Sequence, residues 1–182
     1  MRSFDKPQSD GRDRSLSLPK VVLVVGYKKV GKTALIVKLI AELTSRGYRV
    51  GSVKHHHSDA PIEMDTPGTD SWRHRNAGAK KVALITPKNV AIFCETNEPA
   101  SLDQILEHFM GIDIVLCEGF HREAKSKIEI RSADPNQVLC ASDQNLLAVV
   151  EESPSGAAVP SFGPSSINTL ADLIARKVLN GN

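Results

Sequence analysis

The stretch that decides the fold is residues 21–33, which read VVLVVGYKKVGKT. The uninterrupted aliphatic run from Val21 to Val25 is typical of a strand buried on both faces of a parallel sheet. The apolar spacing of residues 33–46 predicts a helix directly afterwards, which Gly47 ends. The pattern Gly-x-x-x-x-Gly-Lys-Thr therefore stands between a buried strand and an amphipathic helix, which is the context that a phosphate-binding (Walker A) loop requires.

Each fixed position of this loop has a physical role. Gly26 and Gly31 allow backbone N–H groups to wrap an oxyanion, and the helix N-terminus adds a favourable dipole. Lys32 would supply charge at the β- and γ-phosphates, and the Thr33 hydroxyl would ligate Mg²⁺. The predicted nucleotide site also includes the intervening Tyr27, Lys28, Lys29 and Val30, of which the two lysines are either solvated or add charge. The loop contacts phosphates and not the base, so it does not distinguish GTP from ATP.

Composition limits the classes of partner. The 182 residues are 41% hydrophobic and 24% charged, which predicts one globular domain, here residues 21–182. A net charge of +2 does not favour nucleic acid or an anionic membrane as partner. No apolar run is long enough to span a bilayer. Residues 1–20 lack the apolar centre of a secretory signal and predict a disordered N-terminal extension. Three cysteines without a CxxC pair predict buried thiols in a reducing cytoplasm.

The remaining periodicity predicts an α/β fold of the P-loop NTPase class. Strands alternate with helices, which favours a mostly parallel β-sheet with helices on both faces. Two adjacent strands around Pro87-Lys88-Asn89 predict an antiparallel edge hairpin. The predicted strands are 48–54, 81–86, 90–95, 112–117, 127–131 and 146–150, and the further helices are 71–77, 101–110 and 167–179. Ligands of such sheets bind beyond the carboxyl ends of the strands, so the loops there should meet.

Carboxylates follow the predicted site elements. Glu118 ends the apolar strand 112–117 and is the acid expected to hold or orient the Mg²⁺ shell opposite the loop. Asp113 starts the same strand, about five residues or ~16 Å away, and is expected to lie outside the site. Asp65 or Asp70 would complete the Mg²⁺ shell or orient water, although Asp70 is equally suited to cap a helix. We predict Asp65 and Glu118 as catalytic residues and Thr33, Asp65 and Glu118 as metal ligands.

A basic and histidine-rich segment follows the second strand. Lys54 and His55 are predicted to contact the nucleotide, and His56 and His57 come directly after them. Alternating strand faces would let His55 and His57 share one side. No third ligand stands at a recognisable spacing, so a polar or phosphate contact is favoured over zinc.

Three segments together resemble the molybdopterin-guanine dinucleotide biosynthesis protein B (MobB) family. They are residues 24–27 with Gly31-Lys32-Thr33, residues 53–55 followed by Asp-Thr-Pro-Gly-Thr-Asp-Ser-Trp-Arg-His at 65–74 and Ala-Gly-Ala at 77–79, and residues 115–120 with Lys127. The middle segment is the most specific, because P-loop chemistry in general does not require it. Thr69 stands where the family usually has lysine, which removes one candidate phosphate contact.

The resemblance implies a function. It implies a homodimer that binds GTP and Mg²⁺, hydrolyses GTP weakly, and carries molybdopterin as a bound ligand. It also implies that the protein assists a MobA-like molybdenum cofactor guanylyltransferase in forming the guanine dinucleotide of molybdopterin. Two alternatives stay open: an ATP-dependent enzyme of the dethiobiotin synthetase type, in which Lys54 contacts substrate phosphate, and a metallocentre-assembly GTPase, in which His55 to His57 carry nickel.

Overall fold

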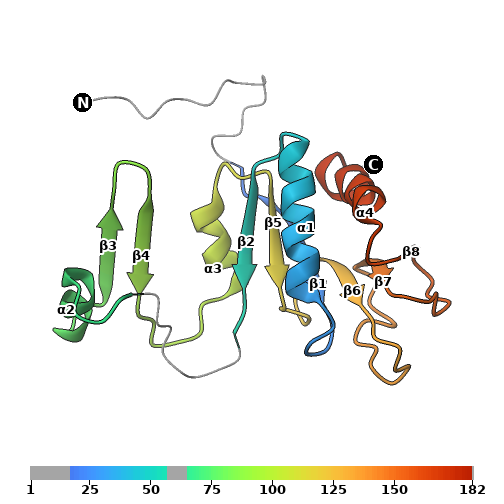
Figure 1. Cartoon of the computed structure of the whole chain (residues 1–182), viewed down its shortest axis with the longest axis horizontal. Coiled ribbons are helices and arrows are strands. Elements are labelled where there is room, and N and C mark those ends of the chain that lie inside the picture. Colours follow the sequence, from blue (N-terminus) through green and yellow to red (C-terminus); the bar gives the residue numbers. More distant parts are fainter. Residues whose placement is uncertain (1–16, 57–64, 182) are drawn as a thin grey trace. The chain divides into compact units, whose positions relative to one another are not determined.

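The computed structural model describes residues 17–56 and 65–181, which fall into two compact units (Figure 1). The first unit contains the described residues up to His55 and from Ile105 onward, and the second lies between them. The predicted N-terminal extension falls outside the described residues as far as residue 16. The first strand begins at Lys20, one residue before the predicted boundary.

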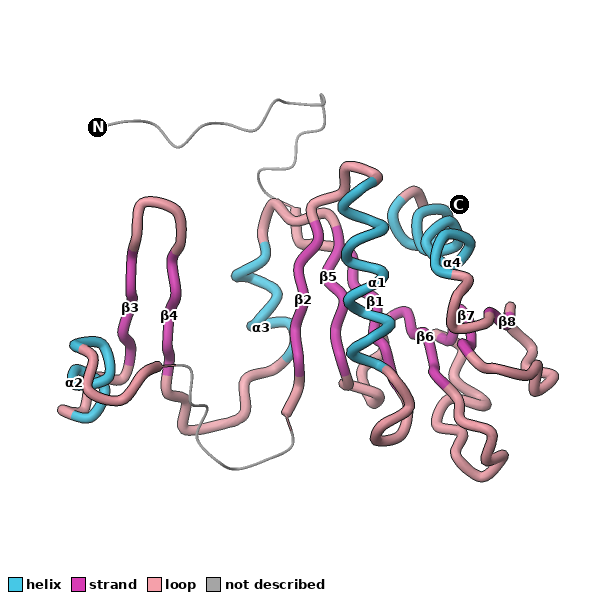
Figure 2. Tube along the Cα trace, viewed as in Figure 1, coloured by secondary structure: helices cyan, strands magenta, loops and turns pink. Residues whose placement is uncertain are grey.

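A six-stranded sheet forms the centre of the first unit (Figure 2). Its strands are β1 (Lys20–Val25), β2 (Val50–Lys54), β5 (Ile114–Glu118), β6 (Ser126–Ile130), β7 (Leu146–Val150) and β8 (Ser161–Phe162). The order is β2-β5-β1-β6-β7-β8, and every neighbouring pair is parallel. The predicted parallel sheet is confirmed. Strand β8 was not predicted, because two residues are too few for a periodic signal.

Two helices cover one face of this sheet. Helix α1 (Lys32–Ser45) and helix α4 (Ile167–Ile174), which continues as a π-helical turn η2 (Ala175–Leu179), share one hydrophobic core with the strands. Leu39 and Leu170 are buried there beside alternate residues of β1, including Val22 and Val24. None of the helices in the described ranges is long and apolar enough to cross a membrane.

The opposite face is covered differently. Helix α3 (Leu102–Leu106) leads into a 3-10 turn, η1 (Glu107–Phe109), whose phenylalanine packs on the sheet. A Cβ atom added at Gly51 would lie 2.6 Å from the Phe109 ring and 3.3 Å from Val115, so the ring occupies the space that a side chain at residue 51 would fill. Helical segments therefore lie on both faces, as predicted.

Charged side chains are buried on this second face. Lys127 pairs with Asp143, and Glu129 pairs with Arg131 at 2.9 Å. Lys127 is 2% exposed and Glu129 is fully buried. Buried charges are stable only when paired, so these contacts hold the loop after β6 on the sheet.

The second unit contains an antiparallel hairpin and a short helix. Strands β3 (Lys81–Ile85) and β4 (Val90–Cys94) pair with each other, and helix α2 (Asp70–Asn76) is capped by Thr69. Arg75 lies 3.5 Å from the centroid of the Phe93 ring. The antiparallel hairpin is confirmed, but it forms a two-stranded sheet of its own and not an edge of the larger sheet. Hairpin formation is a local property of the sequence, whereas attachment to a sheet edge depends on tertiary contacts.

The cysteines follow the prediction in part. Cys117 and Cys140 are buried, and burial raises the pKa of their thiols to about 12 and about 11. Such thiols are almost fully protonated at neutral pH and therefore unreactive. Cys94 differs from the prediction because it is exposed, at the end of a hairpin strand.

Candidate functional site

The loop between β1 and α1 has the backbone that its glycines permit. Gly26 has φ +147° and Gly31, which caps α1, has φ +99°. A Cβ atom at Gly26 would lie 2.5 Å from the carbonyl oxygen of Ile130 in the neighbouring strand β6. Only glycine fits there, because a side chain would drive the loop away from β6.

Lys32 bends back over this loop. Its Nζ donates to the carbonyl oxygens of Gly26 at 3.0 Å and Tyr27 at 2.6 Å. Burial lowers the pKa of Lys32 below its ordinary value, the Glu118 carboxylate acts in the opposite direction, and Lys54 adds to the lowering. The ammonium group is therefore partly desolvated, and a bound phosphate would stabilise its charged form.

Glu118, the last residue of β5, lies beside residues of the neighbouring strands β1 and β2 and of helix α1. Its Oε2 accepts a hydrogen bond from Thr33 Oγ1 at 2.8 Å and lies 3.6 Å from Lys54 Nζ. The parallel register places Val24 of β1 and Lys54 of β2 directly beside Glu118 of β5. Asp113 precedes β5, at the other end of the strand, and binds the backbone N–H of Arg49. The structure thus brings Thr33, Lys54 and Glu118 together, and it places Asp113 away from them.

The donor set beside Lys32 suits Mg²⁺. A hydroxyl oxygen and a carboxylate oxygen already lie in contact, and both are hard oxygen ligands of the kind that Mg²⁺ prefers. Mg²⁺ typically takes only one or two protein ligands beside substrate phosphates and waters, so Thr33 and Glu118 fit this role. Within the described ranges no group of three His, Cys, Asp or Glu side chains could hold a metal, and His57 lies outside them.

The turn after β5 is held by His55. The His55 N–H donates to the Glu118 carbonyl at 3.1 Å, and the His55 and Phe120 rings lie 4.8 Å apart. Phe120 has φ +58°, an uncommon conformation for an aromatic residue. His55 therefore supports the position of Glu118, whereas the sequence predicted a direct nucleotide contact that nothing in these interactions tests.

The remaining loop residues divide by exposure. Tyr27, Lys28 and Lys29 are exposed at the crest of the loop, and Lys29 has φ +66°. Val30 is partly buried and packs against the hydrophobic core. The two exposed lysines are placed where they add positive charge near an anion.

Asp65 lies in the second unit. Its Oδ1 accepts from the Thr66 N–H at 2.9 Å and from Thr69 Oγ1 at 3.0 Å. Burial acts to raise the pKa of Asp65, but hydrogen bonds from Ser71 and Thr69 outweigh it and hold the pKa below the ordinary value. In this unit Asp65 stays ionised and closes the turn that leads into α2, so its predicted metal and catalytic roles stay predictions.

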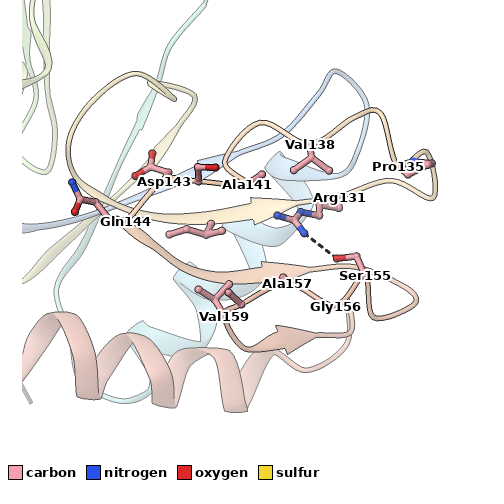
Figure 3. A pocket seen from close by; sticks show the side chains of 13 residues that line it. Arg131, Pro135, Val138, Ala141, Asp143, Gln144, Ser155, Gly156, Ala157 and Val159 are labelled. Carbon is pink, nitrogen blue, oxygen red and sulfur yellow. Dashed lines mark hydrogen bonds between the residues drawn. The ribbon is translucent and has the colours of Figure 1, made fainter.

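Two cavities open beside the loops that follow β6 and β7. One, of about 690 Å³, runs along the sheet from Arg131 and Ser155 to Asp143 and Val159 (Figure 3). The other, of about 370 Å³, is lined by residues 131–135 and 151–155 with Val138. Sequence reasoning assigned no function to these residues. The available signal was their position directly after two predicted strands, at the edge of the sheet where ligands bind.

Comparisons with known proteins agree with this architecture. A family model described as molybdopterin guanine dinucleotide synthesis protein B matches residues 21–152. A molybdopterin-guanine dinucleotide biosynthesis adapter protein of Haemophilus influenzae is 38% identical over 133 residues, 72% of this chain and 74% of its own. The Escherichia coli adapter protein is 33% identical over 156 residues, 81% of this chain and 87% of its own.

Solved structures show the same fold. A crystal structure of molybdopterin-guanine biosynthesis protein B is 28% identical with a TM-score of 0.70, covering 86% of this chain and 97% of that one. The structure of Bacillus subtilis MobB, at 22% identity, covers 87% and 98% with a TM-score of 0.72 and supports the fold alone. The extent of the family match and the identity to two relatives lead to one conclusion: this chain belongs to the molybdopterin guanine dinucleotide synthesis protein B (MobB) family.

Proposed function

We propose that this protein is a GTP-binding adapter of molybdopterin guanine dinucleotide biosynthesis, with slow Mg²⁺-dependent GTPase activity. The observation that carries the proposal is the convergence of Lys32, Thr33 and Glu118 at the end of strand β1. The adapter role comes from the names of the relatives.

The residues of the site have distinct tasks in this proposal. Lys32 exchanges two backbone carbonyls for phosphate oxygens, and the backbone N–H groups of the loop surround the same anion. Thr33 and Glu118 would hold Mg²⁺, which would supply positive charge beside the phosphates. Lys54 Nζ lies 3.6 Å from Glu118 Oε2 and forms an ion pair with it.

Slow hydrolysis agrees with the position of Glu118. Its Oε2 is engaged by the Thr33 hydroxyl and faces Lys54, which suits a metal-shell residue better than a general base. A general base must lie within hydrogen-bond reach of the attacking water and be free to take its proton. We assign Asp65 as a second carboxylate of the metal and water shell, as its position in the segment after the second strand predicts.

The proposed partners are a second copy of the chain, a MobA-like guanylyltransferase and molybdopterin, all in the cytoplasm. The hairpin of the second unit supports the homodimer, because Leu84, Ile85, Val90 and Ile92 are 54–71% exposed. Exposed apolar strands of this kind are costly in water and are typical of interaction surfaces. The guanylyltransferase and molybdopterin follow from the family resemblance.

Calorimetric titration tests the nucleotide and partner assignments together. GTP and ATP are titrated with Mg²⁺ into the protein alone and into its mixture with a MobA-like guanylyltransferase. We expect GTP to bind more tightly than ATP and the protein to form a complex with the transferase. A separate assay of phosphate release should show slow hydrolysis of GTP. Preferred ATP binding with turnover of a small carboxylic acid would instead support a synthetase, and stoichiometric nickel would support a metallocentre GTPase.

Light scattering tests the homodimer. Ile92→Glu places a charge on an exposed hairpin residue and should convert the dimer to a monomer at micromolar concentration. Val37→Glu is the matched control, because Val37 is a similarly exposed apolar residue on α1. A wild-type protein that runs as a monomer, or an Ile92→Glu variant that stays dimeric, would argue against the hairpin interface.

A further inference from the structure

The smaller of the two cavities lies on the phosphate-loop side of the sheet. Strand β6 is the neighbour of β1, and the Gly26 backbone is in close contact with the Ile130 carbonyl at the end of β6. The loop after β6 therefore begins beside the phosphate loop. Strand β7 is next in the order, about 10 Å from β1 at ordinary strand spacing. The cavity of about 370 Å³ between the loops that follow β6 and β7 is thus within reach of a nucleotide held by its phosphates.

A buried arginine gives this cavity a fixed wall. The Arg131 side chain is 8% exposed, pairs with Glu129 at 2.9 Å and donates to Ser155 Oγ at 2.9 Å, as Figure 3 shows for Ser155. Glu151 accepts hydrogen bonds from the Ser155 N–H and from Ser161 Oγ. The two loops are therefore joined before any ligand binds, and Glu151 is already engaged in holding them. Ligand sites are usually preformed in this way.

Besides Glu151 the cavity is lined by two acids, Asp134 and Glu152, and Asp134 is the one whose carboxylate is fixed by neighbouring contacts. It lines the cavity and is exposed, and its Oδ1 accepts the Asn136 N–H at 2.9 Å and the Asn136 amide at 3.2 Å. These contacts fix the carboxylate, and an ionised carboxylate has acceptor capacity on both oxygens. The Watson–Crick edge of guanine presents two adjacent donors, N1–H and the 2-amino group. Adenine presents an acceptor at N1, which a carboxylate repels.

We propose that the guanine base of GTP occupies this cavity and that Asp134 accepts hydrogen bonds from its N1–H and 2-amino groups. The inference rests on the proposed function, because it requires that the triphosphate is held by the loop at Gly26 to Thr33. It adds the residue that selects GTP over ATP. Pterins carry the same amino and oxo groups as guanine, so the experiment separates these two sources.

The test is a change of base specificity in the full chain. Asp134→Asn keeps the oxygen that binds Asn136 and replaces the other oxygen by an amide donor, which suits the 2-oxo group of xanthine. Calorimetric titration with Mg²⁺ should show GTP binding about 10- to 100-fold weaker in Asp134→Asn and XTP binding stronger by a similar factor. Asp172→Asn is the control, since Asp172 is an exposed acid that pairs with Arg46 near α1. Circular dichroism establishes that both variants are folded.

The outcomes separate the two proposals. If the wild-type protein binds GTP through Lys32 but Asp134→Asn leaves GTP and XTP affinities unchanged, the base assignment is wrong and the proposed function stands. A specificity change in Glu152→Gln, a neighbouring acid of the cavity, and not in Asp134→Asn would also overturn the assignment. If Asp134→Asn abolishes binding of a free pterin that Lys32→Ala leaves intact, the cavity is a pterin site. If the wild-type protein binds no nucleotide, both proposals fail.

Discussion

Replacement of Lys32 by alanine is the most direct perturbation of the candidate site. Two charge-assisted hydrogen bonds from Nζ to phosphate oxygens contribute about 3–6 kcal/mol to binding. Before binding, the same group must leave the carbonyl oxygens of Gly26 and Tyr27, which are neutral acceptors and hold an ammonium group less strongly than anionic phosphate oxygens, at a cost of about 1–3 kcal/mol for the two hydrogen bonds. The difference of about 2–3 kcal/mol corresponds to a Kd for GTP raised about 30- to 150-fold.

Calorimetric titration of GTP with Mg²⁺ measures this effect. Lys38→Ala is the matched control, because Lys38 is an exposed lysine on the same helix and carries the same charge. It should change the Kd less than about threefold, because exposed charges contribute little. Thermal unfolding establishes that both variants are folded. A Kd for Lys32→Ala within threefold of the wild-type value would refute the assignment of this loop as the phosphate site.

Three further predictions follow from the same geometry. Glu118→Gln should slow Mg²⁺-dependent GTP hydrolysis about tenfold or more while changing the Kd for GTP far less, and an unchanged rate would place the metal-holding acid elsewhere. Gly26→Ala should lower the free energy of unfolding by about 1–3 kcal/mol, because the new Cβ meets the Ile130 carbonyl oxygen. Urea titration measures this change, and a variant as stable as the wild-type protein would contradict the contact. The hydrogen bond from Lys127 holds the pKa of Asp143 below its ordinary value of 3.8. Ionised Asp143 therefore stabilises the folded state at neutral pH, and this contribution to the free energy of unfolding is lost as the pH falls below about 4. Asp143→Asn should therefore reduce the decrease in unfolding free energy between pH 6 and 3, and an unaltered decrease would argue against the pairing.

The sequence predicted the strand, turn and helix around the candidate site correctly because their signals are local. The strand, the glycine-containing turn and the helix at residues 20–45 are consecutive in the chain, so their spacing is visible without tertiary information. Glu118 was identified because a buried strand that ends in an acid brings that acid to the carboxyl edge of the sheet. The observed 2.8 Å contact between Thr33 and Glu118 follows from the parallel register of β1 and β5.

Other features depend on contacts that no single segment encodes. The attachment of the hairpin was predicted at the edge of the large sheet, yet the hairpin pairs only with itself among the described residues. The support that His55 gives to the turn at Phe120 joins residues 65 positions apart. The cavity at Asp134 arises because Arg131 binds Ser155, 24 residues further along the chain.

The sequence by itself determined that this chain has a phosphate-loop architecture and which residues stand at the ends of its strands. The reason is that burial on both faces imposes a continuous apolar run, and the loop motif imposes its own spacing. Only the tertiary structure decided which of those strand ends are neighbours. Strand order placed Lys54, Glu118 and Thr33 on one side of the phosphate loop and the Asp134 cavity on the other, because hydrogen bonding between strands joins segments that are far apart in the sequence.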